Sequence, residues 1–322
     1  MQPPRPRLRR PSLILLLAAG FFAAPASGQQ TSPAPAPVRQ GSVWKVSDSD
    51  STVYLAGSVH LLREEDHPIS PAYDQAYADS AEVVFEVDMT EMMSPAGMAK
   101  MQSLGTYPPD DSLDRHLKPE TIEQIRQYLA SHPTGAAYLT GLSRLRPGML
   151  FLSISSLEAM RLKARPDLGL EIIYHQRATA DGKPTRGLET IEYQMGLFNS
   201  LSDAEIDALI SKTLADAASM PEVLEKLIAH WHAGDAEALD QLLNEEMDAA
   251  DDDGRFKELL LTGRNRAWVP EIEKALAGSR NIFFLVGAGH LVGEDGVVAL
   301  LRKKGYTVEK VHPRPTALKK AA

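Results

Sequence analysis

Two short apolar runs, rich in β-branched and aromatic residues, open the regular part of the chain. They span residues 43–46 and 52–56, and the polar stretch 47–50 between them is typical of a turn. This pattern predicts a β-hairpin. A helical pattern after Pro71 then leads to a third predicted strand at residues 82–87.

The middle of the chain, from about residue 90 to residue 277, has mainly helical spacing of its hydrophobic positions. Prolines, glycines and Asp or Ser caps separate the segments. The predicted helices span residues 119–130, 147–161, 201–218, 221–233 and 235–247. One strand, at residues 184–188, is expected to interrupt them.

The end of the chain repeats the order of its beginning. An apolar β run at residues 281–286 is followed by a Gly-x-x-His sequence, a helix at residues 296–304 and a strand at residues 306–311. We therefore predict an α/β fold over residues 42–313. Its sheet is built from two related strand–GxxH–helix–strand halves, with a large helical insertion at about residues 90–277.

The first 28 residues have the order of a secretory signal peptide. Four arginines precede an apolar stretch at residues 13–24, and small residues follow at 26–28. The apolar stretch is about a dozen residues long, short of the roughly 20 that a membrane-spanning helix needs. We expect cleavage and no stable membrane anchor, with a retained anchor as the alternative. Residues 29–41 predict a disordered linker, and residues 314–322 a basic tail.

Charge and cysteine content narrow the possible functions. Removing residues 1–28 leaves 30 basic residues against 43 acidic ones, so nucleic acid is not an expected partner. The chain has no Cys, so a metal site would consist of His, Asp and Glu. A hydrophobic content of 43% is typical of a soluble globular protein.

Two matching turns carry the strongest chemical signal in the chain. Gly57 and Gly287 each follow a predicted buried strand, and a glycine there allows a backbone conformation closed to other residues. His60 and His290, three positions later, should lie beyond the carboxyl ends of the strands, where open α/β sheets place their ligands. We expect both imidazoles to converge on one point.

A metal site is one interpretation of this pair. Neutral imidazoles bind Zn, Mn, Fe and Co, usually together with a carboxylate. Glu86 is the nearest candidate, because an acid within an apolar strand is costly to bury unless it is paired or bound to metal. Asp88, two residues on, could take that role instead. The alternative is that both His residues serve structure only.

At this point the chain resembles the TraB/GumN family, relatives of the Tiki metalloproteases and, more distantly, of the erythromycin esterase-like enzymes. The resemblance covers roughly residues 43–312. It depends on these motifs: Gly57-Ser58-Val59-His60, Phe85-Glu86-Val87-Asp88, Gly187-Leu188-Glu189-Thr190 with Gln194, Arg264-Asn265, and Gly287-Ala288-Gly289-His290-Leu291 with Gly293 and Gly296. It implies an α/β core and metal-dependent hydrolysis of a peptide or similar bond.

Three further residues are candidates for catalysis. Glu189 follows a predicted strand and could carry a proton between the attacking water and the leaving group; the alternative is a favourable charge in the first turn of a helix. Arg264 could bind a substrate carboxylate or a developing oxyanion, and Asn265 could donate a second hydrogen bond. A surface salt bridge is the alternative for Arg264.

We therefore predict a periplasmic or secreted hydrolase with His60, Glu86 and His290 around a divalent Mn, Co or Zn ion. Glu189, Arg264 and Asn265 would assist the reaction on a peptide or small-molecule substrate. A binding protein of the same fold, holding a metal, haem or small ligand without turnover, is the alternative.

Overall fold

The computed structural model describes residues 39–132, 134–250 and 254–314. The predicted signal peptide, most of the predicted linker and all but one residue of the predicted basic tail lie outside these ranges. The last three residues of that linker, 39–41, contact the folded part. Arg39 donates to the carbonyl of Pro68 at 2.7 Å, and the amide of Gly41 donates to the carbonyl of His232 at 3.1 Å. Within the described residues no helix is long and apolar enough to cross a bilayer.

A six-stranded mixed sheet forms the centre of the molecule, in the order β4-β3-β5-β2-β1-β6. The four strands β4, β3, β5 and β2 are parallel, and β1 is antiparallel to both β2 and β6. Their bounds are β1 Val43–Ser47, β2 Thr52–Ser58, β3 Glu82–Val87, β4 Thr185–Glu189, β5 Ile282–Gly287 and β6 Val308–Lys310. The predicted α/β class is confirmed.

Strands β2 and β5 are direct neighbours, although about 230 residues separate them in the chain. Gly57 pairs with Val286, and Ser58 pairs with Gly287, so both strands end at the same edge of the sheet. Their carboxyl ends therefore deliver the two Gly-x-x-His turns next to each other.

The idea of two related halves is not confirmed by the sheet. The strand after the first helix, β3, pairs with β5, whereas the strand after the second helix, β6, lies at the far edge beside β1. The order strand, turn, helix, strand recurs, but the second strand takes a different position in each copy.

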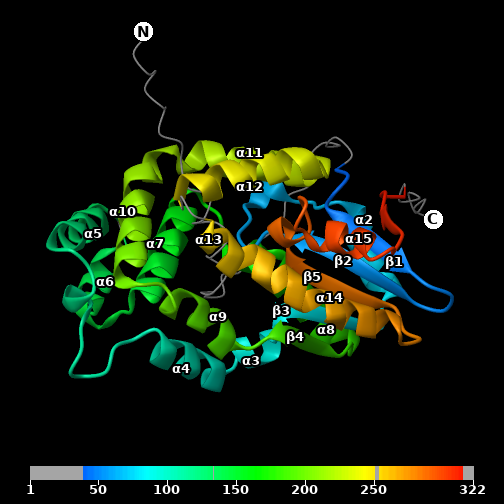
Figure 1. Cartoon of the computed structure of the whole chain (residues 1–322), viewed down its shortest axis with the longest axis horizontal. Coiled ribbons are helices and arrows are strands. Elements are labelled where there is room, and N and C mark those ends of the chain that lie inside the picture. The colour runs from blue at the N-terminus through cyan, green and yellow to red at the C-terminus, as the bar shows by residue number, and fades with distance from the viewer. Residues whose placement is uncertain (1–38, 133, 251–253, 315–322) are drawn as a thin grey trace, which may run out of the picture.

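Helices cover both faces of the sheet and form a lobe beside it (Figure 1). In this view α14 and α15 lie in front of the sheet, with α2 and α8 behind it, and α5, α6, α7 and α10 form the lobe. The longer helices are α2 Pro71–Asp79, α4 Pro95–Leu104, α5 Pro119–Ser131, α7 Pro147–Arg161, α8 Leu170–Asp181, α9 Ile191–Asn199, α10 Asp203–Asp216, α11 Met220–Ala233, α12 Ala236–Ala250, α14 Gly263–Leu276 and α15 Val297–Lys303. The short ones are α3 Met89–Met92, α6 Ala136–Leu139 and α13 Arg255–Lys257.

The predicted strands and several predicted helices match the structure to within a few residues, with α7 matching at both ends. The segment predicted as one helix at residues 201–218 instead has α10 followed by a 3-10 turn at Ala217–Ser219. Helices α4, α8 and α9 were not predicted individually. Two of these three contribute to the cavity described below.

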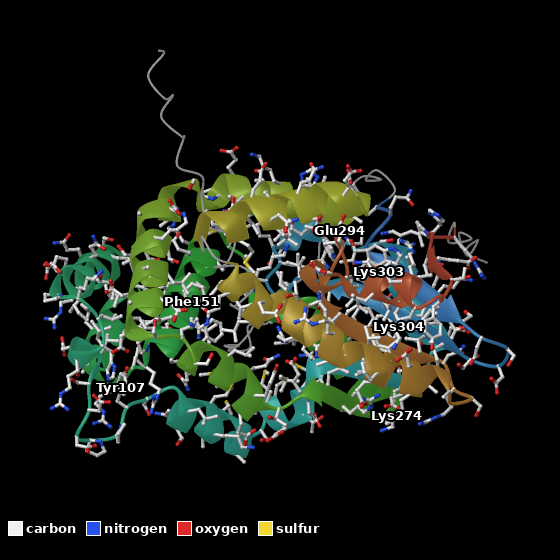
Figure 2. The ribbon with its side chains drawn as sticks, in the orientation of Figure 1. Tyr107, Phe151, Lys274, Glu294, Lys303 and Lys304 are labelled. Carbon is white, nitrogen blue, oxygen red and sulfur yellow. The ribbon has the colours of Figure 1, made fainter. Side chains whose placement is uncertain are left out.

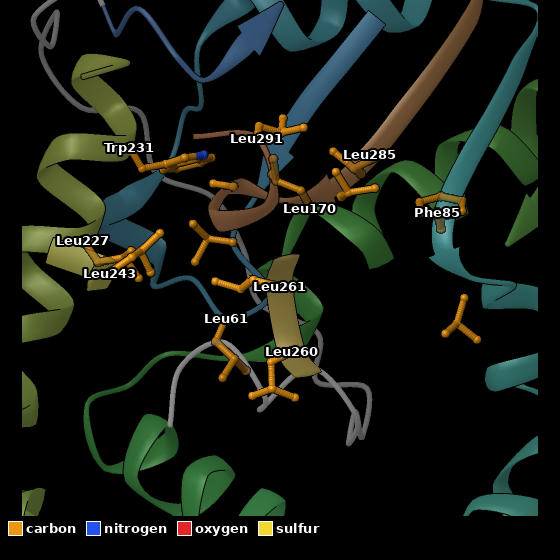
Figure 3. Close-up of a cluster of buried hydrophobic side chains, with 14 of the residues drawn as sticks. Leu61, Phe85, Leu170, Leu227, Trp231, Leu243, Leu260, Leu261, Leu285 and Leu291 are labelled. Carbon is orange, nitrogen blue, oxygen red and sulfur yellow. The ribbon is translucent and has the colours of Figure 1, made fainter. Parts of the chain in front are cut away.

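Apolar packing joins the helical lobe to the strand ends. Helix α7 is buried on all sides from Pro147 to Ala159, as expected for a helix that is apolar all round. Figure 3 shows Leu170, Leu285 and Leu291 gathered around the end of β5, with Trp231 of α11 nearby. By contrast, Figure 2 shows the lysines of α14 and α15 on the outer surface.

A π-helical turn, η6, occupies Glu258–Thr262 and continues directly into α14. Its i to i+5 bonding adds one residue to the turn, and such turns are frequent at functional sites. Leu260 and Leu261 lie in this turn, and Arg264 follows it in the first turn of α14. The same short segment therefore supplies apolar and charged groups to one place.

Candidate functional site

A cavity of about 100 Å³ lies at the carboxyl ends of β2, β3 and β5. His60, Glu86, His290 and Arg264 line it, as do Glu171 and Gln194. The remaining lining side chains are mostly apolar and come mainly from β3, α3, α8, α9 and η6. The sheet edge predicted from the two turns is therefore the place where chemistry-bearing side chains gather.

His60 is fixed in one orientation by a carboxylate. Its Nδ1–H donates to Oε1 of Glu171 at 2.8 Å, and the hydroxyl of Ser58 donates to the same oxygen. Burial lowers the pKa of His60, but the charge and hydrogen bond of Glu171, with Glu86, outweigh burial and raise that pKa to about 9. The Nε2 atom faces Gly287 and the cavity.

His290 is fixed by an amide. The Nδ2 group of Asn265 donates to the carbonyl of Asp295 at 2.9 Å, so its Oδ1 atom faces His290 and accepts the Nδ1–H at 2.7 Å. His290 therefore keeps a lone pair on Nε2, which accepts a hydrogen bond from Nη1 of Arg264 at 3.1 Å. Burial and the nearby guanidinium lower the pKa of His290 to about 3, so its ring is neutral.

Glu86 lies on β3 between the two imidazoles. One carboxylate oxygen accepts the amide N–H of Gly287 at 2.7 Å and lies 3.8 Å from Nε2 of His290. The other oxygen accepts hydrogen bonds from Nη2 of Arg264 at 2.6 Å and from Nε2 of Gln194 at 3.3 Å. Burial opposes ionisation, but Arg264, with His60 and the amide of Gly287, holds the pKa of Glu86 well below its usual range.

Arg264 is buried, not at the surface, and its main partner is Glu189. Its Nε and Nη2 atoms donate to the two oxygens of Glu189 at 2.7 to 3.1 Å. Trp268 donates its indole N–H to Glu189 at 2.8 Å, and Gln194 donates at 3.1 Å. The surface salt bridge considered for Arg264 is therefore wrong, because the side chain is only 8% exposed and its partner only 6%.

These contacts occupy both oxygens of Glu189, and Glu189 is not among the residues that line the cavity. Its observed contacts hold Arg264 in place. A proton-carrying role for Glu189 stays a prediction. Asp88, the alternative to Glu86, caps α3 by accepting the amides of Thr90 and Glu91.

The reason we gave for the two glycines is wrong. Neither has a positive φ; that of Gly287 is −50°. Space explains them instead, because a Cβ at Gly57 would lie 3.0 Å from the Cα of Ala288, and a Cβ at Gly287 would lie 3.1 Å from Oε1 of Glu86. The two turns and the acid approach each other so closely that even a methyl group at either glycine would push against its neighbours.

The position that a Cβ would take at Gly287 is also a point close to all three predicted ligands. The position of a Cβ at Gly287 lies 3.1 Å from Oε1 of Glu86, 3.5 Å from Cδ2 of His290 and 3.8 Å from Nε2 of His60. As the side chains lie, no three His, Asp or Glu residues among the described ones form a ligand set. Arg264 explains part of this, because its guanidinium takes the lone pair of His290.

The buried charges nevertheless suit a divalent cation. Glu86 and Glu189 both pair with the guanidinium of Arg264, and Glu171 pairs with His60, whose raised pKa makes it a cation in the absence of metal. Three carboxylates therefore meet two cations, and a metal that replaced the proton of His60 would meet two uncompensated negative formal charges. The residues present therefore fit a divalent metal both in donor type and in charge.

Sequence reasoning missed three members of the site: Glu171, Gln194 as a hydrogen-bond donor, and Trp268. Glu171 is 111 residues from the imidazole it contacts, and Trp268 is 79 residues from Glu189. For Glu171 and Trp268 no local pattern carried a signal. Gln194 belonged to the resemblance, without an assigned role.

Comparison with known proteins gives the family. The sequence profile of the TraB/PrgY/gumN family matches residues 42–310, most of the chain. The chain belongs to this family. Among curated relatives, the metalloprotease TIKI1 of Danio rerio is 26% identical over 311 residues, covering 83% of this chain and 62% of that protein. TIKI1 of Homo sapiens is 24% identical, covering 83% and 61%.

A bacterial relative, the uncharacterized protein YbaP of Escherichia coli (strain K12), is 21% identical, covering 77% of this chain and 87% of that protein. The chain spans about 60% of the length of these two TIKI1 proteins. No solved structure matches it.

Proposed function

We propose that this chain is an exported metal-dependent hydrolase that cleaves a peptide bond or a related amide or ester bond. The observation that carries the proposal is the set of His60, Glu86 and His290 around one point beside Gly287. Relatives named as metalloproteases support the same reaction class. The arginine-rich start, apolar stretch and small-residue end of residues 1–28 support export.

Each imidazole has the kind of partner that ligating histidines usually have. Glu171 accepts the Nδ1–H of His60, and Asn265 accepts that of His290, which leaves both Nε2 atoms as ligand positions, that of His60 once a metal has replaced its proton. A bound Mn, Co or Zn ion would supply a Lewis acid for the carbonyl that is attacked. Arg264 Nη1 would then lose its acceptor on His290 and become available to an oxygen of the substrate.

Arg264 would stabilise negative charge on the substrate, and Glu189 would hold Arg264 in position. Because Glu189 binds two of its nitrogens, the guanidinium can change its contact to His290 without leaving the site. Transfer of a proton by Glu189 requires one of its hydrogen bonds to open, and we retain it as part of the proposal. Asn265 would keep His290 in the tautomer that binds a cation.

A cavity of about 100 Å³ is far below the roughly 300 to 1,000 Å³ of typical ligand pockets, so haem does not fit there. A metal-binding protein without turnover has the same ligands, and only an assay distinguishes it from a hydrolase.

The test combines metal analysis with cleavage of a peptide library by the purified full-length protein. We expect about one divalent ion per chain and cleavage that EDTA abolishes. His60→Ala and His290→Ala should lose both metal and activity, whereas His116→Ala, which changes an imidazole outside the cavity, should keep both. Glu189→Gln should retain the metal and lose about 100-fold in rate. Metal binding without cleavage of any peptide or ester would support the binding-protein alternative, and full activity in both His variants would refute the site.

A further inference from the structure

The cavity has a charged floor and an apolar wall. All of its charged lining groups, Glu86, Glu171 and Arg264, lie with the two imidazoles at the ends of the strands. Three other elements, α3, α9 and η6, contribute six apolar side chains that the proposed reaction does not use and that we call the apolar wall: Met89, Met92, Leu197, Phe198, Leu260 and Leu261.

We infer that this wall is a specificity pocket for an aliphatic side chain of the substrate, next to the bond that is cleaved. The inference rests on the proposed function and names its substrate class. A charged side chain that lay against these six residues would lose its hydration without gaining a polar partner from them. An aliphatic side chain would instead bury its surface.

Size separates aliphatic from aromatic occupants. A cavity of about 150 Å³ lined by Leu, Ile and Phe holds one benzene molecule, whereas this one measures about 100 Å³. Side chains of the size of Val, Leu, Ile or Met therefore fit, and the rings of Phe and Trp exceed the space.

The apolar surface continues out of the cavity along two helices. Met93 is 42% exposed and lies four residues after Met89, and Tyr193 is 47% exposed and lies four residues before Leu197. Residues four apart share a helix face, so each exposed side chain lies one turn from a residue of the wall. This continuity favours a peptide chain as the occupant, with one side chain inside and neighbouring residues along α3 and α9.

Packing behind the apolar wall holds the pocket open. Phe198 packs against Phe151 of the buried helix α7, with ring centroids 5.7 Å apart. Phe198 and Leu197 are 7% and 8% exposed. Leu197 is the better residue to shorten, because shortening Phe198 would also remove its ring contact with Phe151.

The first arm of the test measures residue preference with a quenched-fluorescence peptide library and the full-length protein. We expect cleavage next to Leu, Ile, Val or Met to exceed cleavage next to Phe, Trp or charged residues by about tenfold or more. Leu197→Ala should enlarge the pocket and raise the relative rate for Phe about tenfold. Leu209→Ala, which shortens a buried leucine of α10 that does not line the cavity, should leave the preference unchanged.

The second arm measures binding without turnover. In protein labelled with ¹³C at the methionine methyl groups, N-acetyl-leucine amide should shift the signals of Met89 and Met92 and leave the exposed Met98 unchanged. N-acetyl-phenylalanine amide should shift them only in Leu197→Ala. If no peptide is cleaved but these shifts occur, the proposed function fails and the pocket stands. Preference for aromatic or charged residues, or methionine signals that do not respond, would overturn the inference.

Discussion

Replacing Arg264 with methionine should destabilise the protein strongly although the apolar part of the side chain is kept. Arg264 is the cation of a buried cluster: its side chain is 8% exposed, and those of Glu86 and Glu189 are 13% and 6% exposed. Removing one partner of a buried ion pair costs about 3 to 5 kcal/mol, because the remaining charge loses its compensation. The pKa of Arg264 points the same way: burial lowers it, but the two carboxylates outweigh burial and raise it above the ordinary value.

The expected loss in the free energy of unfolding is about 3 to 5 kcal/mol and not more, because hydrogen bonds to the carboxylates remain. Trp268 and Gln194 still donate to Glu189, and the amide of Gly287 still donates to Glu86. Urea unfolding followed by circular dichroism, with EDTA present so that metal does not contribute, measures the difference.

Two further variants make the test decisive. Arg266→Met removes a neighbouring arginine whose ion pair with Glu258 is more than half exposed, so its effect should stay below about 1 kcal/mol. Combining Arg264→Met with Glu189→Gln removes both charges and should recover about 1 to 3 kcal/mol relative to the sum of the single losses. A loss below 1 kcal/mol for Arg264→Met, or strict additivity in the double variant, would refute the buried-cluster argument.

Three other outcomes follow from the structure. Gly57→Ala should lower the free energy of unfolding by about 1 to 3 kcal/mol in urea, because its Cβ would lie 3.0 Å from the backbone of Ala288. Gly287→Ala should reduce divalent-cation affinity, measured by calorimetry, at least about tenfold, because its Cβ would fill the space beside Glu86. Burial lowers the pKa of His232 to about 4, so its contribution to stability is complete above the unfolded pKa of about 6.5 and is lost as the pH falls toward 4. Between pH 7 and pH 5 the free energy of unfolding, measured in urea, should therefore fall by about 1 kcal/mol less in His232→Gln than in the wild type, after allowance for the partial exposure of His232.

The strands and the position of the two histidines could be predicted because their signals are local. A buried β run has a recognisable composition, and parallel strands bring their carboxyl ends to one edge whatever lies between them. Glu86 followed from the cost of an acid in an apolar strand. These three residues line one cavity in the structure.

Contacts between distant elements could not be predicted in this way. Helix α8 carries Glu171, yet nothing near residue 171 indicates that its carboxylate meets an imidazole 111 residues away. The pairing of Glu189 with Arg264 likewise joins two residues that lie 75 positions apart in the sequence. The glycines show a different limit: the sequence marks both positions, but the close approach that requires them is made by residues distant in the chain.

The π turn before α14 has a consequence for how the site tolerates insertions and deletions. Each residue of an α-helix advances the direction of its side chains by about 100°, so one extra residue in a turn rotates everything after it by that angle relative to everything before it. Leu260 lies in the turn, and Arg264 and Asn265 follow it, and all three face the same region. Deleting a single residue from Glu258–Thr262 would give a regular helix while turning the arginine away from Glu189. At this position the number of residues in the turn, more than the identity of any one of them, keeps the guanidinium directed toward the strand ends.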